Sequence, residues 1–365
     1  ELCRQVGETP HFFRVLRGLW VSAVVRAEYQ TARELAGQCL VFAQRAEDPL
    51  LLLEARLALG QLLYYLGELT RARKHLEESI PLDVVGQHRS YAFQSSVLFC
   101  RQFAAFVLWR LGYPDQAAVR IHEALSLAQE LADPFNSAFT VASAAQLHQY
   151  RREGRAAQKQ AEAAVTLATE QEFALPLTIG TMIQGWALAV YGHGEEGIAQ
   201  LQEGLAAYQA TGAKILLPYF LALLAEAYGK VGQTDKGLGV LAEALAMAEK
   251  TGERWHEAEL YRLKGELTLQ QENQKSKIET DPRSLTPDPQ GEAEACFLKA
   301  IEIAQKQQAK SLELRATVSL ARLWQQQGKT TEAHSLLSDI YHWFTEGFDT
   351  KDWQEAKALI EALRH

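Results

Sequence analysis

Apolar residues along most of this chain recur at intervals of three and four, the spacing that places them on one face of a helix. In residues 104–128, AAFVLWRLGYPDQAAVRIHEALSLA, two such runs are joined by Leu-Gly-Tyr-Pro-Asp. Gly112 can adopt positive φ and end the first helix, and Pro114 fits the first turn of the next one. In the second run, one face carries Ala117, Ile121, Ala124, Leu125 and Ala128. The stretch therefore predicts a helical hairpin.

The same pattern returns about every forty residues. Gly112 has counterparts at Gly192, Gly232 and Gly328, Gly67 marks an earlier unit, and Arg152 stands at this position in between. Alanines recur where paired helices would cross: Ala105, Ala145, Ala225 and Ala321 in first helices, Ala72, Ala117, Ala157 and Ala333 in second helices. A fixed period of this length is the signature of a solenoid. We expect an all-α, right-handed superhelix in which these glycines occupy corresponding turns.

The register divides the chain into eight hairpins followed by a terminal helix that begins at Asp349 or Thr350. The expected hairpins are 11–46, 51–80, 97–132, 136–171, 176–211, 216–251, 256–308 and 312–345. Because each unit packs on its neighbours, all 365 residues can form one repeat domain. The one interruption is 271–293, which is rich in Pro, Lys, Asp and Ser. Its composition favours a flexible insert in the seventh hairpin; the alternative is a docking or regulated segment.

Composition and charge narrow the classes of partner. The net charge is −8, so nucleic acid is not expected as the main partner, because phosphate binding relies on clustered Lys and Arg. No run approaches eighteen apolar residues, so no membrane span is expected. The widely spaced cysteines predict buried free thiols in a reducing cytoplasm: Cys3, Cys39, Cys100 and Cys296. The chain begins within the pattern and without Met, which suggests a fragment of a longer protein.

Two motifs resemble phosphate-binding loops but are predicted to be hairpin turns. GHGEEG at 192–197 matches G-x-G-x-x-G, yet a helix precedes it, and Glu195 and Glu196 would repel a pyrophosphate. QGKTT at 327–331 lacks the earlier glycine of a P-loop, since position 323 is leucine. The ten histidines show no metal-ligand spacing. We therefore recognise no catalytic residue, cofactor or metal site, and expect a protein that is not an enzyme.

Several stretches resemble the tetratricopeptide (TPR) family. Its pattern is matched by Gly60, Leu63, Tyr64, Gly67, Ala72 and Leu76, and again by Ala225, Tyr228, Gly232 and Leu241. The usual period is about 34 residues, so these would be long-period units. LGYPDQA, PYFLALLAEAYGKVGQ, TGERWHEAELYRLKGEL, AKSLELRATVSLARLWQQQGK and WFTEGFDTKDWQEAKALI also make the chain similar to the C-terminal TPR region of bacterial class III adenylate/guanylate cyclase and STAND ATPase fusion proteins. The array of the maltose-regulon activator is a more distant likeness.

The resemblance implies a scaffold or regulatory arm that acts on upstream ATPase or cyclase domains. Two hypotheses follow from it. In the first, the chain is a non-catalytic interaction scaffold that binds a protein or peptide in its concave groove. In the second, it is a small-molecule sensor whose ligand changes the curvature of the superhelix. A deep apolar pocket would favour the sensor and an open groove the scaffold.

In TPR units the first helix of each hairpin lines the concave face, so the register also predicts groove residues. For the second to sixth units these are Gln61, Tyr64, Tyr65, Gln102, Phe106, Trp109, Arg110, Gln146, Gln149, Tyr150, Trp186, Tyr219, Glu226 and Lys230. Further along, the face becomes charged, with Glu259, Arg262, Glu266, Arg322 and Gln326. Aromatic residues and Arg are typical interface anchors. We therefore expect the partner in the N-terminal half of the groove.

Overall fold

The structure, a computed structural model, describes residues 10–82, 95–275 and 288–364, which form helices and no strand. The first half contains α2 (Pro10–Val25), α3 (Tyr29–Ala46), α4 (Pro49–Tyr65), α5 (Leu69–Ser79), the 3₁₀ turn η1 (Ile80–Leu82), α6 (Ser96–Arg110), α7 (Pro114–Leu131), α8 (Pro134–Tyr150) and α9 (Gly154–Glu170). The second half contains α10 (Ala174–Val190), α11 (Gly194–Ala210), α12 (Leu217–Lys230), α13 (Thr234–Thr251), α14 (Glu257–Lys275), α15 (Pro289–Gln307), α16 (Lys310–Gln326), α17 (Thr330–Tyr341) and α18 (Lys351–Ala362).

Consecutive helices pair into the eight expected hairpins, from α2–α3 to α16–α17, and α18 closes the array. We number the hairpins one to eight in this order. The predicted all-α solenoid and its hairpin boundaries are confirmed to within a few residues. None of the helices is long and apolar enough to cross a membrane, within the described residues.

Local chemistry fixes where the helices begin and end. Asp48 and Asp133 each precede a proline at the first helical position, and each side chain accepts a backbone N–H of the first turn. Within the hairpins, the five predicted turn glycines all have positive φ, from +74° to +96°. Arg152 adopts the same left-handed conformation at φ +60°, which is unfavourable for a residue with a Cβ.

Small residues bring the paired helices close together. The eight alanines predicted at helix crossings are all fully buried: Ala72, Ala105, Ala117, Ala145, Ala157, Ala225, Ala321 and Ala333. In the fifth hairpin the crossing is closer still, because a Cβ on Gly197 would lie 2.5 Å from the carbonyl oxygen of Gly185. The predicted crossings are therefore confirmed.

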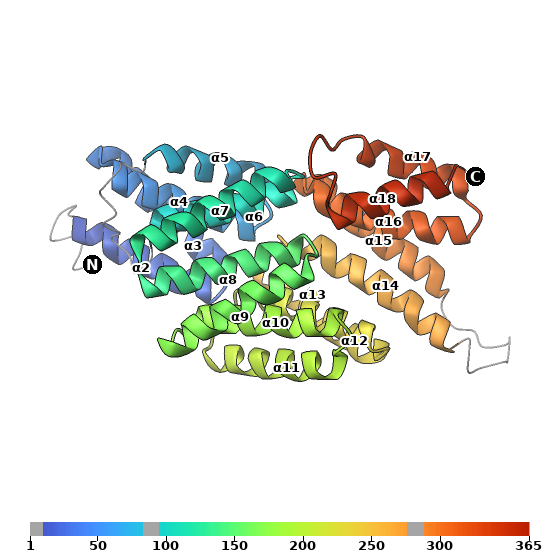
Figure 1. Ribbon diagram of the computed structural model, residues 1–365. Helices are drawn as coiled ribbons and strands as arrows, with labels where there is room; N and C mark the ends of the chain where they lie inside the picture. The colour runs from blue at the N-terminus through green and yellow to red at the C-terminus, as the bar shows by residue number, and fades with distance from the viewer. Residues whose placement is uncertain (1–9, 83–94, 276–287, 365) are drawn as a thin grey trace.

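The superhelix is wound tightly enough for one turn to touch the next. The hairpin turns of the first two units meet the connections that follow units five and six, and those of the third and fourth units meet α16. We call this line of contacts the seam. Its first three contacts join the carbonyl of Val25 to the N–H groups of Lys214 and Ile215, that of Tyr65 to those of Arg254 and Trp255, and that of Trp109 to the Ser311 hydroxyl. In Figure 1 the seam appears where α16 and the loop before α18 lie beside the ends of α6 and α7.

The carbonyls at the seam belong to the last turn of a helix, where they have no partner within the helix. The fourth contact has the same form, since the carbonyl of Tyr150 accepts from Arg315. The contacts of Val25, Tyr65 and Tyr150 satisfy carbonyls that an open solenoid would leave to water, whereas the carbonyl of Trp109 also accepts from the Gly112 N–H. The seam therefore turns an open array into a closed superhelix.

Both ends of the predicted insert at 271–293 are helical. α14 continues to Lys275 and α15 begins at Pro289, capped by Asp288. Residues 276–287 lie outside the described residues. The flanks are helical because the seventh hairpin extends both of its helices past the normal turn position.

Candidate functional site: a charged cleft beside a closed aromatic core

The predicted groove residues do lie on the inner face, but the N-terminal half of that face is closed. All of them except Glu226 and Lys230 are buried. Tyr64 stacks on Trp255 at 5.1 Å between ring centres, and Trp109 stacks on Tyr150 at 5.2 Å. Tyr219 also contacts Trp255, with the two ring centres 5.3 Å apart. The expectation of an open aromatic groove is therefore wrong for this structure, because the seam brings Trp255 onto the aromatic face.

Three glutamines of the predicted set also find hydrogen-bond partners inside this core. Gln102 donates to Thr140 at 2.8 Å, Gln146 donates to the Tyr150 hydroxyl at 2.6 Å, and Tyr219 donates to Gln149 at 2.9 Å. Whether any of these residues binds a partner stays a prediction. In the conformation described, they act as a core.

Arg110 lies at the centre of the aromatic core and is fully buried. Its guanidinium carbon is 4.3 Å from the ring centre of Tyr150, 4.4 Å from that of Trp255, and 5.3 Å from those of Tyr64 and Trp109. Ring faces attract a cation, and the attraction is stronger in a dry environment. Burial, followed by the charge of Arg110, lowers the pKa of the neighbouring His256 to about 3.

Toward the C-terminal half of the described chain, the inner face opens in a cleft of about 210 Å³ between α12, α14, α16 and α18. Ten charged residues line it: Arg152, Lys230, Arg262, Arg315, Arg322, Glu226, Glu259, Glu266, Asp352 and Glu355. Its other walls include Gln149, Trp186, Gln270 and Ser319. Trp186 donates its ring N–H to Glu226 at 2.8 Å. Positive and negative groups are thus equal in number around one opening.

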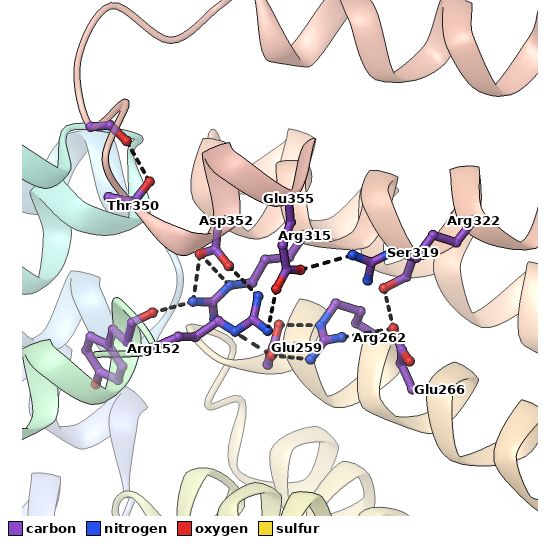
Figure 2. Close-up of polar contacts among 12 residues, drawn as sticks. Arg152, Glu259, Arg262, Glu266, Arg315, Ser319, Arg322, Thr350, Asp352 and Glu355 are labelled. Carbon is purple, nitrogen blue, oxygen red and sulfur yellow. Dashed lines mark hydrogen bonds and ion pairs between the residues drawn. The ribbon is translucent and has the colours of Figure 1, made fainter. Parts of the chain in front are cut away.

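Eight of these charges form a continuous chain of ion pairs across the cleft, which we call the ion-pair chain (Figure 2). Its order is Arg322, Glu355, Arg152, Asp352, Arg315, Glu259, Arg262 and Glu266. Asp352 is its midpoint: one carboxylate oxygen lies 3.0 Å from Arg152, and the other 2.8 Å from Arg315. At the far end, Ser319 donates to Glu266 at 2.6 Å.

The charges in this chain are strongly coupled. Burial alone would raise the pKa of Glu259, but Arg262 and Arg315 outweigh it and hold this pKa well below its ordinary value. Burial would lower the pKa of Arg152, whereas Asp352 and Glu355 raise it above its ordinary value. Glu259 and Arg152 are therefore both charged at neutral pH, and each is compensated by its neighbours in the chain.

The cleft unites residues that the sequence register placed in separate repeats. Of the predicted set, it contains Gln149, Trp186, Glu226 and Lys230, and it also contains the charged C-terminal residues Glu259, Arg262, Glu266 and Arg322. Sequence reasoning missed Arg152, Arg315, Asp352 and Glu355. One signal was available for Arg152, which replaces the glycine that its turn position favours.

The described residues contain no group of three His, Cys, Asp or Glu side chains arranged to hold a metal ion. GHGEEG and QGKTT lie at hairpin turns between helices, as predicted. Cys39, Cys100 and Cys296 are buried free thiols, as predicted, and Cys3 lies outside the described residues. Burial raises the pKa of Cys39 to about 11 and that of Cys100 to about 12, which opposes thiolate chemistry at both.

A helical solenoid closed around an aromatic core, with one charged inner cleft, defines the class of this protein: a TPR-like repeat protein. No family model matches the sequence, and no curated protein matches it in sequence. Among solved structures, the chain is similar to a Rap protein complexed with competence and sporulation factor, with 13% identity, 97% of each chain covered and a TM-score of 0.60.

Two other solved structures are similar. IFIT1, as a monomeric mutant with Gppp-AAAA, shares 16% identity over 90% of this chain and 68% of that one, with a TM-score of 0.51. A STAND protein with a tetratricopeptide repeat sensor from Pyrococcus horikoshii shares 17% identity over 98% of this chain and 51% of that one, with a TM-score of 0.47. The Rap and IFIT1 likenesses show the fold. The Rap and IFIT1 structures hold different ligands, so the ligand chemistry of this chain has to be argued from its own cleft.

Proposed function

We propose that this chain is a non-catalytic interaction module, a scaffold or regulatory arm that binds a polypeptide segment in its inner cleft. This proposal rests on one observation: ten charged side chains from separate repeats line a cleft that opens on the described inner face. Charged and polar walls suit a segment of peptide, whose backbone and side chains can exchange hydrogen bonds and ion pairs with them. An apolar small molecule would find little to bury there.

The class III cyclase and STAND ATPase resemblance adds a context to this proposal. In that context, occupancy of the cleft would set the activity of ATPase or cyclase domains elsewhere in the same polypeptide. A second candidate function, a sensor whose ligand changes superhelix curvature, is favoured by one observation. Arg315 lines the cleft and also makes the fourth contact of the seam, and Asp352 joins it to Arg152. A ligand that moved them would alter the closure of the superhelix.

The test is affinity capture from lysate with the full chain as bait, comparing variants by quantitative mass spectrometry. Lys230→Glu with Arg322→Glu reverses two charges at the mouth of the cleft, where both side chains are exposed. The matched control is Lys159→Glu with Lys250→Glu, which reverses two exposed charges on the second helices α9 and α13. We expect the cleft variant to lose its partner and the control to retain it. Equal capture by both variants would place binding elsewhere.

The choice of residues follows from burial. Arg262 is a poor candidate for charge reversal because its side chain is only 16% exposed and is bonded to Glu259 and Glu266. Its loss would leave buried acids without a partner, which destabilises the fold directly. Changes at Lys230 and Arg322 leave the pairs of Arg262 in place, and Glu355, which loses Arg322, keeps Arg152. A loss of capture therefore reports on the cleft.

A further inference from the structure

Two acidic residues of the ion-pair chain, Asp352 and Glu355, come from a single helix at the C-terminal end of the array. α18 presents Asp352 and Glu355, one helical turn apart, to Arg152, Arg315 and Arg322. Glu355 bridges Arg152 at 3.0 Å and Arg322 at 3.1 Å. The first turn of α18 is therefore seated in a site made by three arginines (Figure 2).

Two of the three arginines of this site, Arg152 and Arg315, are fixed in place. Arg315 is held by the Tyr150 carbonyl and by Glu259, and its guanidinium lies 4.9 Å from the ring centre of Trp109. Its side chain is only 9% exposed. Arg152 is positioned by the turn after α8, which packs within the array. An oxyanion site with guanidinium groups held in this way loses little entropy when it binds a carboxylate.

The acidic side is attached less firmly. α18 packs against α16 and α17, at the edge of the array, through a small apolar cluster that includes Ala356, Leu359 and Ile360. Helices at the edges of a structure open more readily than those packed on both sides. Asp352 and Glu355 can therefore leave the site by movement of one turn, whereas Arg152 and Arg315 are held within hairpins four and eight.

We propose that Asp352 and Glu355 occupy, within the chain, a binding site for an acidic polypeptide segment, which displaces them from Arg152, Arg315 and Arg322. The proposal rests on the proposed function of the cleft and names the chemistry of its partner. Asp352 and Glu355 define the pattern expected of the external segment, which is two carboxylates about one helical turn apart. Displacement breaks the bond from Arg152 to Asp352 and so releases the first turn of α18 from the turn after α8.

Competition within the chain makes a specific prediction about affinity. An external segment binds only to the fraction of molecules in which the arginines are free, so its apparent affinity rises when the internal acids are weakened. Replacing Asp352 and Glu355 by their amides keeps their shape but removes their charge. The external segment should then bind more tightly, although the protein has lost two of its own interactions.

The probe is a fluorescein-labelled peptide, DTKDWQEAK, which carries the sequence of residues 349–357, followed by anisotropy with the full chain. We expect D352N/E355Q to bind it at least about tenfold more tightly than the unmodified chain does. The control is E332Q/E361Q, which removes the same charge from exposed positions of α17 and α18 and should bind like the unmodified chain. A peptide with Asn and Gln at the positions of Asp352 and Glu355 should not bind either protein.

Equal affinity for D352N/E355Q and the unmodified chain, or no binding to a D352N/E355Q protein that is still folded by circular dichroism, would overturn the proposal. If that double variant is unfolded, Glu355→Gln alone gives the same comparison, because Arg152 keeps Asp352. Failure here is distinguishable from failure of the proposed function. If the peptide test fails but Lys230→Glu with Arg322→Glu still abolishes capture of the partner, the cleft binds its partner by another chemistry. If that variant captures the partner as well as its control does, the proposed function itself is wrong.

Discussion

Glu253 offers a sharp test of how the seam is held together. Its carboxylate lies in the connection between α13 and α14 and is only 2% exposed. It accepts from the Tyr29 hydroxyl at 2.7 Å, the Trp255 ring N–H at 2.7 Å and the Leu216 N–H at 3.3 Å. It therefore joins the first hairpin to two later connections, without an ion-pair partner among the described residues.

Burial raises the pKa of Glu253 to about 7, although the hydrogen bonds from Tyr29, Trp255 and Leu216 oppose the shift. A carboxyl whose pKa is higher in the folded than in the unfolded state stabilises the fold at low pH. This stability is lost as pH rises from 4.5 through 7. At about 1.4 kcal/mol per pH unit, the loss amounts to about 3 kcal/mol. His256 acts in the opposite direction, because its lowered pKa costs stability as pH falls below 6.5.

The contribution of Glu253 is isolated by comparing Glu253→Gln with the unmodified chain, because Gln resembles the protonated acid at every pH. Denaturant melts at pH 5, 6, 7 and 8.5 give the difference in unfolding free energy between the two proteins. We expect this difference to shift in favour of the variant by about 3 kcal/mol between pH 5 and pH 8.5. Glu243→Gln, an exposed carboxyl on α13, is the control and should show a constant difference. A constant difference for Glu253→Gln as well would refute the assignment of Glu253 as a buried, readily protonated acid of the seam.

Three further predictions concern packing and are checked by denaturant melts. Ala117→Leu overfills a helix crossing at a fully buried position and should destabilise by about 1–3 kcal/mol, so an unchanged midpoint would contradict the crossing. Gly197→Ala should destabilise because its Cβ would meet the backbone of Gly185 and Ala189, whereas Gly239→Ala, with open space around it in α13, should stabilise by about 0.5–1 kcal/mol. Trp109→Ala should cost about 3–5 kcal/mol because its ring is buried against Tyr150; a near-neutral effect would indicate an open groove instead.

The repeat architecture could be predicted from the sequence because its signals are local. A glycine at each turn and an alanine at each crossing act within one hairpin, and Gly67, Gly232, Ala117 and Ala225 all lie where the register placed them. Asp-Pro at residues 48–49 likewise caps a helix through contacts within four residues.

The site was harder to predict because it depends on how far the superhelix winds. The register correctly put Trp109 and Tyr150 on the inner face, but nothing local to either residue indicates that the connection carrying Trp255 returns to cover them. The meeting of Arg152 with Asp352, 200 residues later in the chain, has the same origin. Such contacts follow from small rotations summed over several repeats, and these rotations are not encoded in the spacing of any one motif.

The seam also fixes the number of repeats that one turn can hold. An open solenoid can gain or lose a unit anywhere, because each unit contacts only its neighbours. Here the carbonyl of Tyr65 meets Arg254 and that of Trp109 meets Ser311, so a hairpin duplicated between them and their partners would bring each turn to the wrong connection. One turn of the superhelix therefore closes with a fixed number of hairpins. Growth of this array by duplication is therefore compatible with its closure only outside the span that the seam joins.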